Sequence, residues 1–172
     1  MKVLATFDGS EFAEAVLPTL ARVAELPDAE VTFLAVEHQP HGKLASGSVQ
    51  AGVIATADPV RGGPLEVIKP PDSPYAETKE QALERRVNER IDYMAGLRKQ
   101  LPASATCRYE VILAHHPAQA IIDWAKEHQP DVIVMATHGR AGLAHAVFGS
   151  TTEAVVRSGV APVLLVRPKG AG

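Results

Sequence analysis

The sequence predicts an α/β protein in which a parallel sheet is covered by helices on both faces. Short apolar segments rich in Val and Ile have the length of buried strands. Segments with apolar residues at helical spacing lie between them, and the two kinds alternate along the chain. Parallel strands need such helical crossovers, which cover both faces of the sheet. The 172 residues, 46% of them hydrophobic, suit one core, so we expect a single domain over residues 1–172.

The first strand and helix carry clear local signals. Residues 2–7 are apolar on both faces, as in a buried strand. Ser10 is a favourable N-cap with Glu11 in the first turn, and apolar residues follow at helical spacing until Pro27 ends the helix. Residues 30–37 are apolar and β-branched, which predicts the second strand.

The segment from about residue 38 to residue 75 has a different composition. It holds six prolines and five glycines and shows no sustained periodicity. We interpret it as a long loop or partly disordered insertion. Loops longer than ~15 residues in compact domains are usually functional or mobile. The insertion therefore either overhangs a site at the strand ends or is a plain surface excursion.

The second half repeats the alternation. Residues 76–101 predict the longest helix, with an apolar stripe on one side. We assign its charged residues to solvent; they are Glu80, Glu84, Arg85, Arg86, Glu89, Arg90, Arg98 and Lys99. The remaining predicted elements are strand 106–113, a helix beginning at Pro117, strand 132–135, helix 151–158 and strand 160–166. We assign Trp124 and the single cysteine, Cys107, to packing.

Composition restricts the classes of partner. The net charge is −3 and the pI about 6.2, so no basic surface for nucleic acid is expected. No apolar run approaches the roughly 18 residues of a membrane span, and the N-terminus lacks the features of a signal peptide. One cysteine fits a reducing compartment. We expect a cytoplasmic protein without a nucleic-acid or membrane partner.

Several kinds of chemistry are disfavoured by the motifs that the chain lacks. It has no dinucleotide fingerprint, no Gly-Lys-Ser/Thr phosphate loop and no Cys/His set with zinc spacing. We assign the pair His115-His116 to capping of the helix at Pro117. A catalytic triad could be composed of Ser150, His138 and Asp8, but the sequence does not place Ser150 on the sharp strand-to-helix turn that such a nucleophile needs. We predict no catalytic residue and no metal site built by the protein alone.

The stretch from Val132 to Ser150 is the best candidate site. A strand ends, a loop containing Gly139 follows, and a helix begins at Gly149-Ser150. The first N–H groups of a helix are unpaired and carry partial positive charge, and small residues let an anion reach them. We therefore interpret the stretch as a phosphate-binding site, although such glycines also occur as helix caps and in turns that bind nothing.

The same stretch resembles the C-terminal half of a universal stress protein domain. The family pattern is Gly-x2-Gly-x9-Gly-Ser/Thr. This chain aligns with it at Ala136, Gly139, Gly149 and Ser150, so alanine replaces the first glycine. Residues 7–11 and 117–122 also resemble the family, and only residues 38–75 lie outside the match.

The resemblance implies a Rossmann-like fold, with an open five-stranded parallel sheet in the order 3-2-1-4-5, and ATP binding, with Mg²⁺ as a companion. Asp8 would lie near the ribose or a phosphate-bound metal, and Val36 would meet adenine through its backbone. Residues 135–136 would line the nucleotide. The full implied set of binding residues is Asp8, Val36, Met135, Ala136, Gly139, Arg140, Gly149, Ser150 and Thr151.

The resemblance also implies a role and a partner. It implies a stress-response protein that works through nucleotide-dependent conformation or partners, and a homodimer formed by the last strand, from Val160 to Val166. Ala136 and the insertion leave one alternative, a nucleotide-independent dimeric module. An ATP-pyrophosphatase is disfavoured because Asp8-Gly9-Ser10 lacks that class's Ser-Gly-Gly loop. We predict no enzymatic main role.

Overall fold

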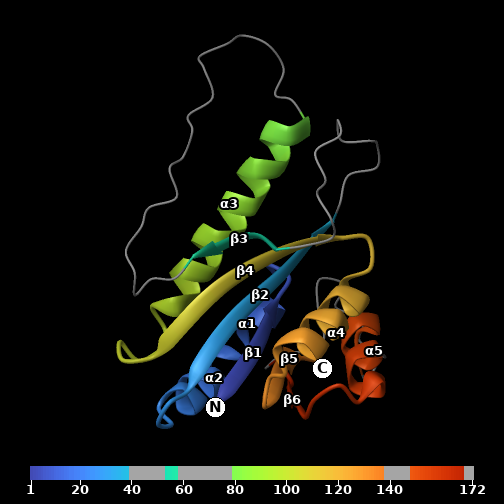
Figure 1. Cartoon of the computed structure of the whole chain (residues 1–172). Coiled ribbons are helices and arrows are strands. Elements are labelled where there is room, and N and C mark those ends of the chain that lie inside the picture. The colour runs from blue at the N-terminus through green and yellow to red at the C-terminus, as the bar shows by residue number, and fades with distance from the viewer. Residues whose placement is uncertain (39–52, 58–78, 138–147, 169–172) are drawn as a thin grey trace.

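A computed structural model describes residues 1–38, 53–57, 79–137 and 148–168. Six strands form one sheet in the order β3-β4-β2-β1-β5-β6 (Figure 1). The strands are β1 (Lys2–Phe7), β2 (Glu30–His38), β3 (Val53–Ala57), β4 (Thr106–Ala114), β5 (Val132–Ala136) and β6 (Val163–Val166).

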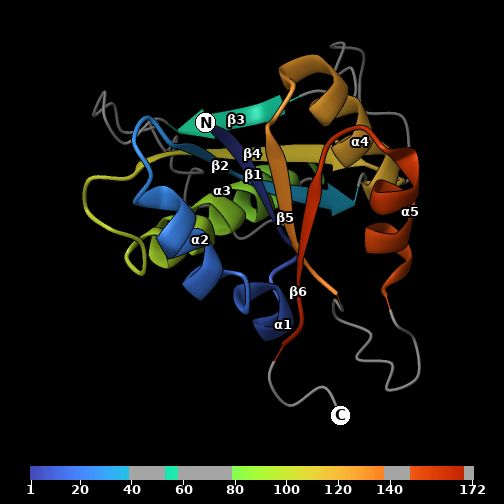
Figure 2. The ribbon, with the colours of Figure 1, turned by 90° about the horizontal axis from the view of Figure 1, so that it is seen from below.

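Helices cover both faces of this sheet. They are α1 (Glu11–Glu14), α2 (Leu17–Ala24), α3 (Lys79–Arg98), α4 (Pro117–His128) and α5 (Ser150–Ser158). Figure 2 shows α1, α2 and α3 on one side of the strands and α4 and α5 on the other. Two clusters of buried apolar side chains fill the two interfaces, one under α1–α3 and the other under α4 and α5. The predicted α/β class with two covered faces is confirmed.

The order of the five parallel strands is also as predicted. In chain order without β3, the order 3-2-1-4-5 corresponds to β4-β2-β1-β5-β6. β1 pairs in parallel with β2 on one edge and with β5 on the other. From β1 the chain first builds the sheet outward through β2 and β4, and it later returns to the other edge of β1 to add β5 and β6. The strand order therefore reverses at β1. In such sheets, ligands bind at this reversal, beyond the carboxyl ends of the strands.

A sixth strand corrects the prediction for residues 38–75. Val53–Ala57 forms β3, which pairs antiparallel with the edge of β4, for example Ala57 with Tyr109. The prediction of a continuous loop was wrong at these five positions. Three of the five residues are β-branched, but a run of five gives only a short local signal within a glycine- and proline-rich segment. Its structure depends on the unpaired edge that β4 offers, which is a tertiary feature.

The first predicted helix is divided in two. Ser10 is the N-cap, as expected, and its Oγ accepts a hydrogen bond from the Ala13 N–H at 3.3 Å. The helix does not continue to residue 24, because α2 begins anew at Leu17 with Pro18 in its first turn. Proline has no N–H to donate within a helix and is favoured at a helix start.

Both predicted packing residues lie in the core. Cys107 is fully buried in β4 and Trp124 is buried in α4. The Trp124 Nε1–H donates to Glu110 Oε2 at 2.6 Å, and its ring stacks on His128 with centroids 4.1 Å apart. The indole thereby joins α4 to β4 and provides a partner for a carboxylate that is itself buried.

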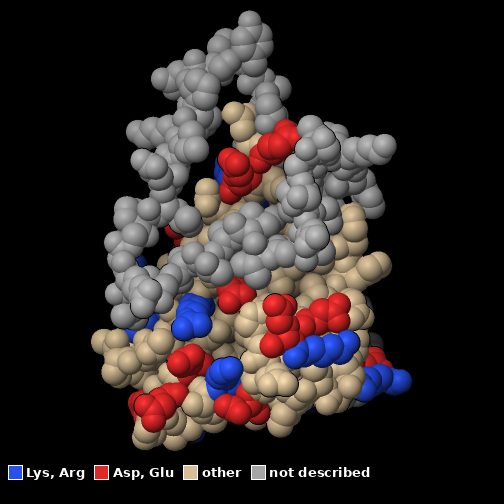
Figure 3. Space-filling view, in the orientation of Figure 1, with Lys and Arg blue, Asp and Glu red and all other residues tan. Residues whose placement is uncertain are grey.

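The surface carries charges of both signs. On the face shown in Figure 3, basic and acidic side chains lie close to one another over the described part of the chain. Mixed charge of this kind is typical of a solvated surface. Among the described helices, none combines the length and apolar character needed to cross a bilayer.

The contact between Trp124 and Glu110 makes a stability prediction. Trp124→Phe keeps an aromatic ring but leaves the buried Glu110 carboxylate without its indole donor. We expect the free energy of unfolding, measured by urea denaturation, to fall by about 1–3 kcal/mol. In a Glu110→Met background the same substitution should cost clearly less. An equal loss in both backgrounds would show that ring packing, and not the hydrogen bond, is responsible.

Candidate functional site

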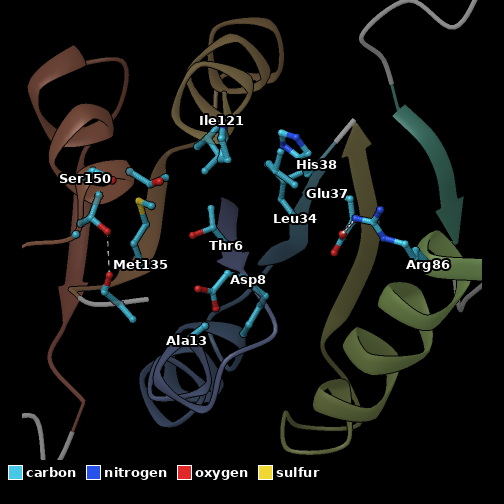
Figure 4. A pocket seen from close by; sticks show the side chains of 17 residues that line it. Thr6, Asp8, Ala13, Leu34, Glu37, His38, Arg86, Ile121, Met135 and Ser150 are labelled. Carbon is cyan, nitrogen blue, oxygen red and sulfur yellow. Dashed lines mark hydrogen bonds and ion pairs between the residues drawn. The ribbon is translucent and has the colours of Figure 1, made fainter. Parts of the chain in front are cut away.

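A cavity of about 460 Å³ opens where the strand order reverses. Its walls come from the carboxyl ends of β1, β2 and β5, from the first turns of α4 and α5, and from α3. Figure 4 shows Thr6 and Asp8 in the middle of this space, Ser150 on one side and Arg86 on the other. The location is the one that the reversal at β1 predicts for a ligand.

Seven of the nine predicted binding residues line this cavity. They are Asp8, Val36, Met135, Ala136, Gly149, Ser150 and Thr151. Gly139 and Arg140 lie outside the described residues, as does His138 of the Ser150-His138-Asp8 combination considered above. Residues 128 positions apart in sequence, such as Asp8 and Ala136, are thus brought into one site.

The N-terminus of α5 forms one wall. Gly149 is the N-cap, with an extended backbone and no side-chain hydrogen bond to the first turn. The helix is anchored to β5, because Gly149 N–H donates to Thr137 O at 2.7 Å and Thr152 Oγ1 donates to Ala136 O at 3.1 Å. The first-turn residues of α5 therefore line the cavity from a fixed position, and the amides at a helix N-terminus carry partial positive charge.

Ala136 occupies the position of the first glycine in the family pattern. It ends β5, is buried, and is not among the residues with positive φ. A β-carbon is therefore accommodated without backbone strain. The alanine narrows the cavity only by one methyl group in its wall.

A tight turn after β1 holds Asp8. Its Oδ1 accepts hydrogen bonds from Ser10 N–H at 3.0 Å and Ser10 Oγ–H at 2.6 Å, which is an Asx-type turn. Gly9 has φ +80, a conformation that favours glycine. A β-carbon at Gly9 would also collide with Nη1 of Arg90. A side chain at residue 9 would therefore displace the Arg90 guanidinium from its present position and strain the turn backbone.

Glu37, near the end of β2, is a cavity residue that sequence reasoning missed. It is 9% exposed and lines the cavity. Its Oε2 accepts from Arg86 Nη2 at 2.8 Å, and its Oε1 accepts from Arg90 Nε at 2.7 Å and from Arg90 Nη2. The assignment of Arg86 and Arg90 to open solvent was therefore wrong. A single charge at the end of an apolar strand was the available signal, because a buried carboxylate needs partners.

The ionisation of Glu37 follows from these contacts. Burial alone would raise the pKa of Glu37, but the hydrogen bonds and charges of Arg86 and Arg90 outweigh it and hold the pKa below 4.5. The carboxylate is thus ionised at neutral pH. With two guanidinium groups around one carboxylate, the cluster carries a net charge of +1.

The histidine pair does not act as predicted. His116 is at the N-cap position of α4 with an extended backbone, but its side chain makes no capping hydrogen bond. His115 instead meets His38, with ring centroids 5.4 Å apart in an edge-to-face arrangement. Within the described ranges, no group of three or more His, Cys, Asp or Glu side chains is arranged to hold a metal ion.

The model of the universal stress protein family matches residues 52–167. The chain belongs to this family. Universal stress protein YxiE of Bacillus subtilis is 26% identical over 170 residues, covering 96% of this chain and 98% of that relative. Universal stress protein MJ0577 of Methanocaldococcus jannaschii is 30% identical over 76 residues, 44% of this chain and 47% of the relative. The second match thus spans about half the length of that relative.

Solved structures of universal stress proteins share this fold. The structure of MJ0577 superimposes with a TM-score of 0.70 at 23% identity, covering 98% of this chain and 96% of that one. A family protein from Arabidopsis thaliana with AMP bound has a TM-score of 0.57 at 13% identity, covering 99% and 97%. A universal stress protein in complex with cAMP has a TM-score of 0.53 at 14% identity, covering 97% and 96%.

The Glu37 cluster predicts a pH dependence of stability. Because the folded-state pKa of Glu37 is lowered, its ionisation stabilises the fold above the unfolded pKa, and this contribution is lost as the pH falls through the folded pKa. Glu37→Gln should lower the free energy of unfolding at pH 7 by about 2 kcal/mol and flatten its decline towards about pH 3.5.

The matched control is Glu89→Gln. Glu89 also pairs with an arginine, Arg85, at 2.8 Å, but both side chains are more than half exposed. Such a pair contributes little. Urea midpoints from pH 7 to about 3.5 should therefore change little in the control. Equal behaviour of the two variants would contradict the role of the Glu37 cluster.

Proposed function

We propose that this universal stress protein binds ATP in the cavity between β2, β1 and β5 and acts as a stress-response protein through nucleotide-dependent conformation or partners. One observation carries the proposal. The first turn of α5, whose N-cap Gly149 makes no side-chain hydrogen bond, borders a cavity lined by seven of the binding residues that the family resemblance implies.

Size and electrostatics support a nucleotide as the ligand. A cavity of about 460 Å³ lies within the range of small-ligand sites. The amides of Ser150 and Thr151 at the helix N-terminus favour phosphate groups. Relatives of the same fold are recorded with AMP bound and in complex with cAMP, which supports an adenine nucleotide here as well.

The cavity suggests one orientation for ATP. Phosphates at α5 place the ribose near Asp8 and the base towards β2, where the backbone at Val36 lines the wall. Mg²⁺ is usually held by one or two carboxylates together with substrate phosphates, and Asp8 is a carboxylate in the right place for that arrangement. From the family motif alone, we also propose that Gly139 and Arg140 contact the phosphates.

The proposal is for binding and not for turnover as the main role. Ser150 is the first residue of α5 and is exposed, instead of standing on a strained elbow between a strand and a helix. Slow hydrolysis of a bound nucleotide by water remains compatible with this geometry. Comparing ATP turnover of the wild type and Asp8→Ala would measure it.

Calorimetric titration tests the binding proposal. Wild-type protein should bind ATP with Mg²⁺, and Gly149→Val should weaken binding by about tenfold or more, because a branched side chain at the N-cap would occupy the phosphate position. Gly96→Val is the control, since a β-carbon at this α3 position meets nothing within 4 Å. No binding at millimolar ATP, or equal binding by both variants, would reject the proposal.

The sheet edge favours a second function, a dimeric interaction module. Among the described residues β6 pairs only with β5, so its outer edge is open. Leu164 on this strand is 39% exposed. Open apolar edges favour pairing with another strand. We propose a homodimer formed by the last strand, independent of whether nucleotide is bound.

Charge at this edge should abolish the dimer. Leu164→Lys would place two like charges across the proposed interface, and edge lysines oppose strand pairing. Light scattering coupled to size exclusion should show a dimer for wild type and a monomer for Leu164→Lys. Val156→Lys, on α5 and also 39% exposed, should stay dimeric. A monomeric wild type would refute the interface.

A further inference from the structure

The cavity has a second positive wall opposite α5. Arg86 and Glu37 both line it, on the side that Figure 4 shows farthest from Ser150, with Asp8 between the two sides. The sequence of charges across the cavity is therefore positive at the α5 amides, negative at Asp8 and positive at the Glu37 cluster. A ligand that carries an anionic group at each end matches this order.

Within the cluster, Arg86 is the member with donors left for a ligand. The Arg90 side chain is 15% exposed, makes two hydrogen bonds to Glu37 and packs over Gly9. The Arg86 side chain is 38% exposed and, among the described residues, bonds Glu37 through one N–H. A guanidinium has five N–H donors in a planar fork that suits phosphate.

The positions of the strands define which part of a nucleotide can reach Arg86. β5 and β2 lie on either side of β1, so their carboxyl ends are about 10 Å apart, two strand spacings. A nucleotide whose 5′-phosphates lie at α5 extends across β1 towards β2. Its ribose and base, not its 5′-phosphates, then lie nearest Arg86. This step rests on the proposed function.

A purely structural role does not explain Arg86. Arg90 already joins α3 to Glu37 with better burial, whereas the Arg86 side chain holds Glu37 from the cavity wall and is 38% exposed. In dinucleotide-binding domains, a carboxylate accepts a hydrogen bond from the ribose 2′-hydroxyl, whereas an arginine nearby accommodates a ribose 2′-phosphate. Here both carboxylate oxygens of Glu37 accept hydrogen bonds from guanidinium groups. The group that the cluster offers to a ligand is therefore the Arg86 guanidinium and not the Glu37 carboxylate.

We propose that the cavity selects nucleotides that carry a second phosphate on the ribose, at the 2′ or 3′ position, and that Arg86, held by Glu37, is the residue that selects them. The 5′-phosphates would occupy the α5 amides and the ribose phosphate would lie against the Arg86 fork. The two positions share one chemistry, and the experiment distinguishes them.

Calorimetric titration with three probes tests this selection: adenosine 5′-monophosphate, adenosine 2′,5′-bisphosphate and adenosine 3′,5′-bisphosphate. Wild-type protein should bind one bisphosphate about tenfold or more tightly than the monophosphate, and added salt should reduce that preference. Arg86→Gln should bind the monophosphate as wild type does and lose the preference. Arg85→Gln, a neighbouring arginine paired with Glu89 outside the cavity, should keep it.

Each outcome has a defined meaning. Equal wild-type affinity for all three probes overturns the selection but leaves ATP binding intact, whereas no binding of any probe or of ATP overturns both. A preference that survives in Arg86→Gln also overturns it. If that variant does not fold, Arg86→Lys replaces it. Arg86→Lys keeps the charge without the fork and should show a reduced preference, and an unchanged preference contradicts the role of Arg86.

Discussion

The parallel pairing of β1 with a strand on each edge is the constraint on which the rest of the molecule depends. β2 and β5 lie on opposite edges of β1, so the chain crosses the sheet in two directions and its helices cover opposite faces. The connections that follow β1 and β5 lead to opposite faces, so they separate at the carboxyl end of β1 and leave a crevice between them. The turn at Asp8 and the start of α5 both line this crevice.

Two kinds of positive charge result from this geometry. One belongs to the backbone, because α5 begins at the end of β5 and is held there by the bonds to Thr137 and Ala136. The other belongs to side chains, because α3 crosses the end of β2 and brings two arginines to Glu37. The absence of a side chain at Gly9 leaves room for the Arg90 guanidinium beside the turn that holds Asp8.

The candidate site divides into residues that sequence could predict and residues that it could not. Asp8 follows a strand, and Gly149 and Ser150 begin a helix, so local pattern and family motif predict their positions. Arg86 and Arg90 have the spacing of a polar helix face, and nothing local distinguishes a solvated arginine from one bound to a distant carboxylate. β3 was missed for a related reason, because an edge strand is stabilised mainly by its partner.

By itself, the sequence determined the α/β class, the buried stripes and the N-cap at Ser10, because burial periodicity and capping act within a few residues. It also determined the glycine-containing helix start, which the family motif records. Only the tertiary structure decided that Glu37 pairs with Arg86 and Arg90, that β3 extends the sheet and that one cavity joins the ends of β2, β1 and β5. These contacts join residues far apart in the chain, so they can form and stabilise the fold only after the strands have paired.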